Sequence, residues 1–270
     1  MLKKLKSQLL QKSQTLYPNW DISIALRYFP VIREIKSHFS PKSSILEIGS
    51  GEFGILPYLG KGYNVTGVDT NFGNASQKNM KMVKLSGEKL PFPSKSFDVV
   101  VCVDTLEHVS EITREQIIDE MIRVSKSRTY LAYPRGEIAR ACDTILSHYY
   151  RFTHKQPLAF LDEHARYGLP KDKIIAGHIH KSLQHNNQTA SVSHIGNTNS
   201  FLWLFMLLLG FSENAWLTSV YKILPLTTPL LSKINFFPTY RSLWTLKLQV
   251  VPAYNGQKML AKNLPKILAM

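Results

Sequence analysis

The chain has 270 residues, of which 44% are hydrophobic and 19% charged, a composition typical of a globular protein with a sizeable core. Two cysteines in this length exclude a disulfide framework and indicate a reducing compartment, so we expect a cytoplasmic protein. A single α/β sheet domain commonly reaches this length, and we therefore expect residues 1–270 to form one domain.

The formal net charge of +14 is the unusual part of the composition. A positive field attracts nucleic acid, anionic lipid or acidic metabolites, and charge alone does not choose among them. The lysines and arginines are scattered rather than grouped, and the Asn-Pro-Pro-Tyr type of motif found in enzymes that modify nucleic-acid bases is absent. Nucleic acid is therefore disfavoured, and a small molecule or an anionic membrane surface is the expected partner.

Residues 1–42 predict two helices that cap the domain. Residues 1–12, MLKKLKSQLLQK, place apolar residues at helical spacing and lysines mostly on the other side, which is typical of a basic amphipathic helix. Such a helix either docks on the domain or lies on an anionic membrane, and it is not a signal peptide because no apolar run or cleavage site follows. A second helix is predicted over residues 22–39, with Pro30 breaking or kinking it.

Residues 43–134 alternate between strands and helices. Runs rich in Val, Ile and Leu, apolar on both faces, are typical of a parallel sheet covered by helices on both sides. The predicted strands cover residues 44–48, 64–68, 80–85, 97–103 and 128–134, with helices over 55–59 and 113–125. A ligand crevice is then expected at the carboxyl ends of the strands, where Gly49, Asp69, Asp104 and Tyr133 fall.

Residues 135–252 carry a thinner signal. We expect helices over 135–152 and 171–184, a loop over 160–170 that crosses the open end of the sheet, strands over 190–196 and 241–251, and a tail over 253–270. Residues 199–238 form an apolar helical insertion before the last strand. Its longest apolar run is about eleven residues, short of the ~20 that a spanning helix needs. The insertion is either a buried helical element, or a lid or partly membrane-inserted hairpin that admits a lipid-like ligand.

The turn ILEIGSGEFG is the most informative local pattern. A buried strand runs into Gly49, Ser50 and Gly51 before a helix, which exposes backbone amides and lets a ligand approach the main chain closely. With Gly54 the spacing matches G-x-G-x-x-G, so an NAD-dependent oxidoreductase has to be considered. Glu47 argues against it, because a carboxylate two positions before the first glycine repels a pyrophosphate and suits a cationic ligand.

A second segment, GEKLPFPSKSFDVVVCVDTLEHV over residues 87–109, helps to decide which class of nucleotide-binding protein this is. Together with ILEIGSGEFG and VTGVD it resembles the class I S-adenosylmethionine-dependent methyltransferases, in particular the small-molecule group with an LPF…SFDVV…LEHV module. The resemblance covers roughly residues 43–134. It implies a Rossmann-like, doubly wound, mostly parallel seven-stranded sheet, with N-terminal helices over the cofactor and the last two strands as a hairpin at one sheet edge.

The resemblance also implies S-adenosylmethionine as the cofactor and suggests how it is held. Asp69 would accept both ribose hydroxyl protons, because an ionised carboxylate has only acceptor sites; the alternative is that it caps the following turn. Glu47 would face the charged amino acid end of the cofactor. The further expected cofactor contacts are Gly49, Ser50, Gly51, Thr70 and Asp104, with Ser86, Gly87 and Glu88 where the family often has an adenine-binding aspartate.

His108 is the candidate catalytic residue, a general base for a hydroxyl acceptor. Correct placement of the acceptor supplies most of the rate of methyl transfer, and a base is needed only for a poor nucleophile. The alternative is a packing role, because the LEHV tetrapeptide occurs in members with different acceptors. A loop containing Asp162, Glu163, His164 and Arg166 is expected to overhang the pocket, where these groups could hold a polar acceptor; the alternative is that they are solvated loop charges. No metal is expected, because His178 and His180 cannot converge on one ion from a helix or a strand.

We therefore predict a methyltransferase that acts on a small molecule, with O-methylation slightly favoured. Lipid-linked and glycan-linked acceptors are both open, as is peripheral attachment to the inner face of the membrane. The alternative is a catalytically silent cofactor-binding scaffold that acts through a membrane or protein partner. Phe53 in place of the usual third glycine, and Ser86 in place of the aspartate, keep this alternative open.

Overall fold

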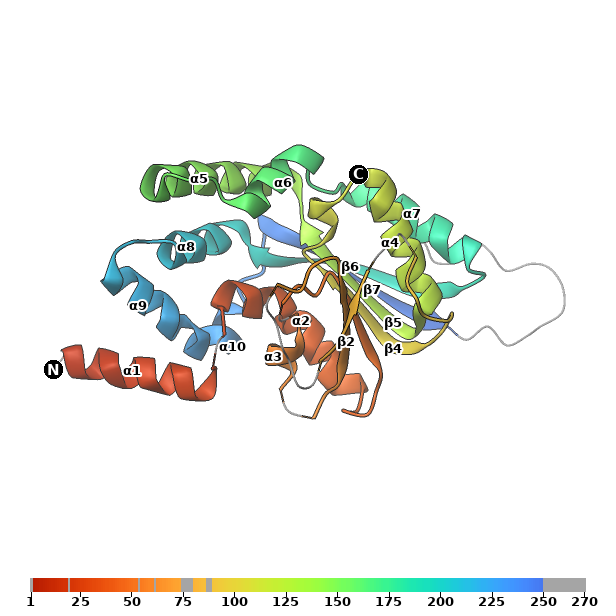
Figure 1. Cartoon of the computed structure of the whole chain (residues 1–270), viewed down its shortest axis with the longest axis horizontal. Helices are drawn as coiled ribbons and strands as arrows, with labels where there is room; N and C mark the ends of the chain where they lie inside the picture. The colour runs from red at the N-terminus through yellow and green to blue at the C-terminus, as the bar shows by residue number, and fades with distance from the viewer. Residues whose placement is uncertain are drawn as a thin grey trace.

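The structure is a computed structural model that describes residues 2–18, 20–52, 54–60, 62–73, 80–85 and 89–249. A seven-stranded sheet with the order β3-β2-β1-β4-β5-β7-β6 forms its centre (Figure 1). The strands are β1 (Ile45–Ile48), β2 (Val65–Asp69), β3 (Met80–Lys84), β4 (Phe97–Val103), β5 (Ser125–Pro134), β6 (Thr189–Asn199) and β7 (Thr239–Gln249). Strands β1 to β5 are parallel, and β7 runs antiparallel to both β5 and β6. The predicted fold class is confirmed.

The strand order determines which edge of the sheet, here called the functional edge, can carry a ligand crevice. β1 is central and pairs with β2 on one side and β4 on the other, so that Ile48 lies opposite both Val68 and Cys102. The order reverses at this point, and a ligand crevice in such a sheet lies where the carboxyl ends of these strands meet. Residues that directly follow β1, β2 and β4 are therefore brought to one edge although they are far apart in the sequence.

Two helical layers cover the sheet and explain why its strands are apolar on both faces. Helices α2 (Ile22–His38) and α3 (Leu56–Leu59) pack on one face, and α4 (Glu111–Val124) and α7 (Asp172–His185) pack on the other. Alternate residues of β4 divide between these layers: Val99 and Val101 join the α2 core, whereas Val100 and Cys102 join the α4 core. Pro30 lies inside α2 and does not break it.

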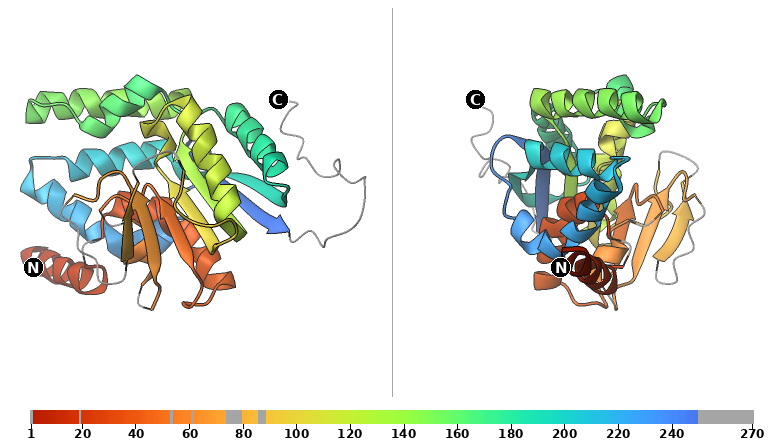
Figure 2. Two further views of the ribbon diagram at one scale, coloured as in Figure 1. Left: turned by 45° about the vertical axis from the view of Figure 1, so that its right-hand side comes forward. Right: turned by 90° about the vertical axis from the view of Figure 1, so that its left-hand side faces the viewer.

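A further helical group lies beyond the carboxyl ends of β5 and β6, where β7 begins. It consists of α5 (Gly136–His154), α6 (Ala159–Tyr167) and α8 (Ser200–Gly210), which share a core that includes Leu146, Leu161, Trp203 and Tyr240. Figure 2 shows these helices projecting past the sheet on the side where the N-terminus lies. This group forms one wall of a cavity at the functional edge.

The predicted insertion before the last strand is helical. Between β6 and β7 the chain forms α8, α9 (Ala215–Ile223), the short 3-10 helix η2 (Leu224–Thr227) and α10 (Thr228–Leu231). Its ends meet, because Asn199 pairs with Thr239 across the two strands. α8 is buried on the side of Trp203 and Leu207, whereas Phe205 on its other side is 55% exposed. The insertion is thus neither wholly buried nor free of the core.

The prediction of a loop over residues 160–170 was wrong, because this segment forms helix α6. Its acidic and basic residues suggested solvent, but Leu161 and His164, three residues apart, bury one helical side against α5 and the first turn after β4. Gly168 ends the helix with a φ of +69°, a conformation that glycine adopts without strain.

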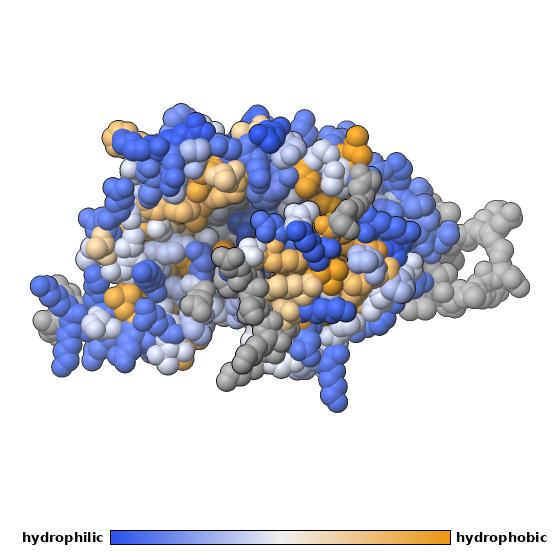
Figure 3. Space-filling model, viewed as in Figure 1, coloured by the Kyte–Doolittle hydropathy of each residue, from blue (hydrophilic) through white to orange (hydrophobic). Residues whose placement is uncertain are grey.

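The first helix, α1 (Leu2–Leu16), packs on the insertion rather than on the sheet. Its buried Ser13 hydroxyl donates to the Lys222 carbonyl of α9 at 2.7 Å. Leu5 stays 51% exposed, and hydrophilic side chains cover most of this helix in Figure 3. Among the described residues, no helix is both long and apolar enough to cross a bilayer. The assignment of the chain to one domain stays a prediction.

Candidate functional site

The turn after β1 has the close backbone approach that its glycines predicted. Gly49 has a φ of +73°, and its amide donates to the Val68 carbonyl of β2 at 2.8 Å. A Cβ atom on Gly49 would stand 2.2 Å from the Thr105 hydroxyl, so no other residue fits here without a shift. Ser50 is 5% exposed and continues the turn. The turn is therefore pressed against the end of β4.

Gly51 and Asp69 are brought together at the functional edge. The Gly51 amide donates to Oδ2 of Asp69 at 2.7 Å, and Oδ1 of Asp69 accepts from the Asn71 amide at 3.0 Å. The Cβ position of Gly51 meets no atom within 4 Å, so this side of the turn is open. Thr70 is exposed beside the same carboxylate, with its hydroxyl 3.4 Å from Oδ1. The carboxylate of Asp69 thus reaches the turn as the sequence led us to expect.

Glu47 lies beneath this turn with no solvent exposure. Its Oε1 accepts from the Tyr28 hydroxyl and its Oε2 from the Ile55 amide, both at 2.7 Å. Burial raises the pKa of the Glu47 carboxyl to about 7, although these two hydrogen bonds oppose the shift. A Cβ atom on Gly54 would stand 2.1 Å from Oε2, which explains that glycine. Glu47 braces the turn from behind, and its contact with a cofactor stays a prediction.

Of the remaining predicted cofactor residues, some lie outside the described part of the chain and one, Asp104, pairs with arginines. Ser86, Gly87 and Glu88, together with Phe53, lie outside the described residues. Asp104 follows β4 as predicted, but both of its oxygens accept hydrogen bonds from arginines of this chain. Its expected cofactor contact stays a prediction.

Arg27 of α2 and Arg241 of β7 hold the Asp104 carboxylate. Nη1 of Arg27 donates at 3.0 Å, and Nη2 and Nε of Arg241 donate at 2.7 Å and 2.8 Å. Burial alone would raise the pKa of Asp104, but the two guanidinium charges outweigh it and hold the pKa well below the usual range. These three side chains therefore join helix α2, the end of β4 and strand β7.

A cavity of about 370 Å³ opens beside this ion pair. One wall is apolar and comes from α8 and its end, with Trp203, Leu207 and Phe211. The opposite wall is polar and carries Arg27, Asp104, Glu107, His108, His164 and Arg241. The cavity therefore pairs a surface for an apolar group with a dense set of ionisable groups.

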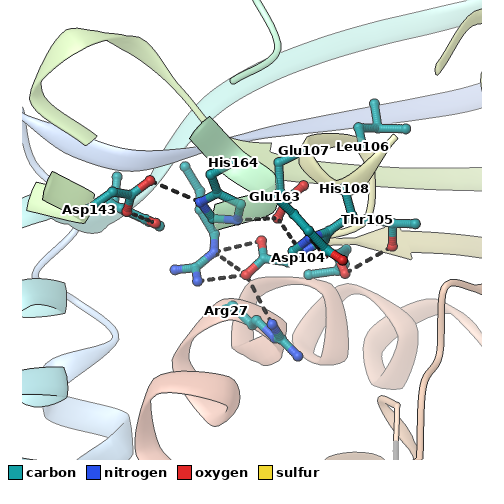
Figure 4. A network of polar contacts seen from close by, with 12 residues as sticks. Arg27, Asp104, Thr105, Leu106, Glu107, His108, Asp143, Glu163 and His164 are labelled. Carbon is teal, nitrogen blue, oxygen red and sulfur yellow. Dashed lines mark hydrogen bonds and ion pairs between the residues drawn. The ribbon is translucent and has the colours of Figure 1, made fainter. Parts of the chain in front are cut away.

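Glu107, His108 and His164 gather at the polar wall. Glu107 and His108 lie on the 3-10 helix η1 (Leu106–His108), and His164 comes from α6 (Figure 4). The Nε2 atoms of His108 and His164 lie 3.9 Å and 4.0 Å from Oε1 of Glu107. These three groups could hold a metal ion.

Each histidine of this cluster also faces a carboxylate with its other ring nitrogen. Nδ1 of His108 lies 2.6 Å from Oε2 of Glu163, and Nδ1 of His164 lies 2.9 Å from Oδ2 of Asp143. Burial and the neighbouring His164 lower the pKa of His108, against the raising effect of Glu163. Burial, followed by the charge of Asp104, raises the pKa of Glu107 well above its usual value.

His178 and His185 of α7 and His194 of β6 each face a separate partner. On α7, Nδ1 of His178 is 3.5 Å from Glu115 and that of His185 is 2.9 Å from Asp119. His194 of β6 stacks on Trp244 with ring centroids 4.1 Å apart.

Sequence reasoning missed Arg27, Arg241 and Glu107. It expected His164 over the pocket, where His164 does line the cavity, but in a loop instead of a helix. A signal existed for the arginines, since each is the one charged residue of a mostly uncharged segment rich in large apolar side chains, IALRYF or TYRSLW. A lone charge in a buried segment indicates a buried partner. No local pattern could have joined His164 to Glu107.

Comparison with known proteins agrees with this geometry. Residues 46–133 match the family model of the methyltransferase domain. The ubiquinone biosynthesis O-methyltransferase of Rickettsia bellii (strain OSU 85-389) is 32% identical over 137 residues, which cover 43% of this chain and 55% of that protein. The Rickettsia akari (strain Hartford) protein of the same name is 30% identical over 137 residues, covering 43% and 53%. The chain spans about half the length of the curated relatives it matches.

Solved structures support the fold. The plantazolicin methyltransferase BpumL, in complex with a monoazolic desmethylPZN analog and SAH, superposes with a TM-score of 0.52 at 13% identity, over 92% of this chain and 99% of that one. The plantazolicin methyltransferase BamL gives a TM-score of 0.50 at 15% identity, over 89% and 90%. Residues 46–133 thus match a methyltransferase domain, and the sheet that contains them has the fold of these solved methyltransferases.

Proposed function

We propose that the chain transfers a methyl group from S-adenosylmethionine to an oxygen atom of a small molecule bound in the cavity beside Asp104. The observation that carries the proposal is the contact between Gly51 and Asp69 at the meeting point of β1 and β2. It leaves Gly51, at a positive φ that glycine adopts without strain, open to a ligand, with a carboxylate at hydrogen-bonding distance from the same turn.

The cofactor would bind across this edge of the sheet. Asp69 would accept the two ribose hydroxyls, and the turn from Gly49 to Gly51 leaves space beside its backbone for the amino acid end. Glu47 supplies negative potential from below while holding the turn in place. Thr70, Ser86, Gly87, Glu88 and Asp104 complete the proposed cofactor contacts.

The acceptor would bind in the cavity between α2, η1, α6 and α8. Thr105 joins the two sites, since it touches the β1 turn through Gly49 and immediately follows Asp104 of the cavity wall. The methyl group of the cofactor would lie at this junction and His108 on the acceptor side. The relatives named above methylate oxygen in ubiquinone biosynthesis according to their names, which favours a hydroxyl acceptor here as well.

The apolar wall favours an acceptor with a lipid-like part, delivered from an anionic membrane on the inner face. Trp203, Leu207 and Phe211 give the cavity an apolar side, and α9 beside them carries Trp216, which is 61% exposed. α1 packs on the same helix and keeps Lys3, Lys4 and Lys12 exposed. Each lysine near an anionic surface contributes about 1 kcal/mol, so a few suffice for reversible attachment.

The first test compares ligands by thermal unfolding of the purified chain. S-adenosylmethionine and S-adenosylhomocysteine should each raise the melting temperature, and NAD should not, because only a ligand that binds the folded state stabilises it. Transfer of the labelled methyl group to hydroxylated aromatic compounds with and without alkyl chains then tests the reaction. Binding without transfer to any of them would favour the silent scaffold, and a shift with NAD alone would overturn the proposal.

A further inference from the structure

We propose that Glu107, His108 and His164 form a binding site for one divalent transition-metal ion in the wall of the acceptor cavity. The sequence had led us to expect no metal, because it drew attention to the histidines of α7. The residues that converge belong to η1 and α6 and lie more than fifty positions apart in the chain, so that only the fold unites them.

The first argument is that two imidazole nitrogens and one carboxylate oxygen converge on one point. The carboxylates of Glu163 and Asp143 sit at hydrogen-bonding distance from Nδ1 of His108 and His164, so each Nδ1 carries the proton. In the neutral imidazole the Nε2 atom is then an acceptor. Both Nε2 atoms approach a carboxylate oxygen of Glu107, and the three ligand atoms lie within 4.8 Å of one another. A metal cation at the centre would be within reach of all three atoms and would replace a proton on the Glu107 carboxyl.

The second argument is that Glu107 lacks a counterion of its own. The residue is 1% exposed, and its Oε2 has no hydrogen-bond partner among the described residues. The guanidinium groups of Arg27 and Arg241, whose charges act on Glu107, already hold Asp104. A buried carboxylate without a partner is costly, whereas one that ligates a metal is not.

The third argument is the set of residues behind the histidines. Metal-binding histidines usually give their second ring N–H to a carboxylate, which fixes the ring and the tautomer. Here both histidines have such a carboxylate, and Asp143 is itself held by the Tyr240 hydroxyl at 2.5 Å. The whole unit, from Tyr240 through Asp143 to His164, is buried. Figure 4 shows the contact between Asp143 and His164.

Two imidazole nitrogens and one carboxylate oxygen suit zinc, iron, manganese or cobalt better than calcium or magnesium, which prefer oxygen alone. Metal–nitrogen distances of about 2.0–2.1 Å require the three side chains to move together by less than about 1 Å. The protein supplies three ligands, so the remaining positions face the cavity.

On the proposed function, the ion binds the acceptor hydroxyl and lowers its pKa. The proton leaves to solvent, the oxygen forms a bond to the methyl carbon, and the electron pair of the broken carbon–sulfur bond stays on the cofactor sulfur. His108 then acts on the acceptor through the ion instead of taking the proton directly.

The test measures metal binding without any acceptor. The full chain is stripped with a chelator and titrated with Co²⁺, which reports nitrogen ligands by visible absorption, and calorimetry with Zn²⁺ gives the affinity. We expect one equivalent to bind, with at least a hundredfold loss of affinity in His164→Ala and His108→Ala and a ten- to hundredfold loss in Glu163→Gln. His185→Ala is the matched control, because that imidazole also faces a carboxylate, Asp119, but on the surface.

The outcomes separate cleanly. The site is supported if binding is saturable, is weakened in the cluster variants and is unchanged in His185→Ala. If His164→Ala does not fold, His108→Ala still tests the site, because His108 is partly exposed. Absence of one-equivalent binding, or binding that neither His108→Ala nor His164→Ala weakens, overturns it. S-adenosylmethionine affinity, measured in the same samples, judges the proposed function separately, because the cofactor residues are not altered.

Discussion

The Gly51 amide and the Asp69 carboxylate are joined by a 2.7 Å hydrogen bond, so the turn after the first strand and the end of the second form one unit. The carboxylate keeps further acceptor sites, since an ionised carboxylate offers about four lone-pair positions. A ligand that approaches Gly51 therefore meets Asp69 as well.

Replacing Asp69 with alanine should abolish most cofactor binding while the fold survives. Removal of one member of a charge-assisted pair costs a ligand about 2 kcal/mol or more. Calorimetry with S-adenosylmethionine measures the loss, and circular dichroism monitors the fold. Asp119→Ala, on the surface of α4, is the control that should leave the affinity unchanged. Unaltered affinity in Asp69→Ala would remove the ribose assignment.

A side chain at Gly51 should block the cofactor more than it harms the fold. The Cβ atom enters open space, so Gly51→Val places bulk where the ligand approaches, while the φ of +53° costs about 1–2 kcal/mol of backbone strain. Gly62→Val imposes comparable strain, at a φ of +94°, in the loop before β2 at the opposite end of the strand. Thermal unfolding should place the two variants close together, and only Gly51→Val should lose cofactor affinity. Normal cofactor binding by Gly51→Val would mean that the turn is not the cradle.

Glu47 should make the protein less stable as the pH rises. Its pKa is raised by burial from 4.5 to about 7, so between these values the folded state binds more protons than the unfolded state. The free energy of unfolding should fall by on the order of 2–3 kcal/mol from pH 4.5 to pH 7 through this group alone. Urea unfolding of the wild type and Glu47→Gln at pH 5 and pH 8 isolates the contribution. Identical pH dependences in the two proteins would contradict it.

Breaking the ion pair at Asp104 should destabilise the whole chain. Asp104→Ala leaves two guanidinium groups without their carboxylate, and an unpaired buried charge costs about 3–5 kcal/mol. Asp162→Ala removes a carboxylate that pairs with Arg151 on the surface and should cost less than about 1 kcal/mol. Urea unfolding measures both. Equal effects would mean that Asp104 contributes only as a surface charge does.

The chain should bind anionic vesicles through α1. Sedimentation with anionic vesicles at low salt should pellet the full-length chain, neutral vesicles should not, and removal of residues 1–12 should weaken the binding. Lys81, Lys84, Lys126 and Lys173 changed together to glutamine provide a control of comparable charge elsewhere. If both vesicle types, or neither, bind the protein, the membrane has no part in its function.

The sheet was predictable because its strands are apolar on both faces and are separated by helices. This pattern can be recognised in each segment without knowing which strands pair. The turn from Gly49 to Gly51 and the meeting with Asp69 follow from the same local rules. The cavity wall did not follow, because it depends on contacts between distant elements. Arg27 and Arg241 lie 77 and 137 positions from Asp104.

Helix α6 illustrates why local composition fails at such a site. Glu163 and His164 read as solvated charges, yet each is held by a partner on another element, His108 for the first and Asp143 for the second. The polar residues that suggested an exposed loop are polar because they take part in the contacts of the site.

The pairing of Asn199 with Thr239 affects how readily the insertion can change in length and sequence during evolution. Because the two strands already hold its ends together, the entropy of closing the segment rises only slowly with its length. Residues can be gained, lost or exchanged there without a change in register of any strand. The wall of the acceptor cavity can therefore change while the cofactor turn after β1, three strands away from β7 in the sheet, keeps its structure.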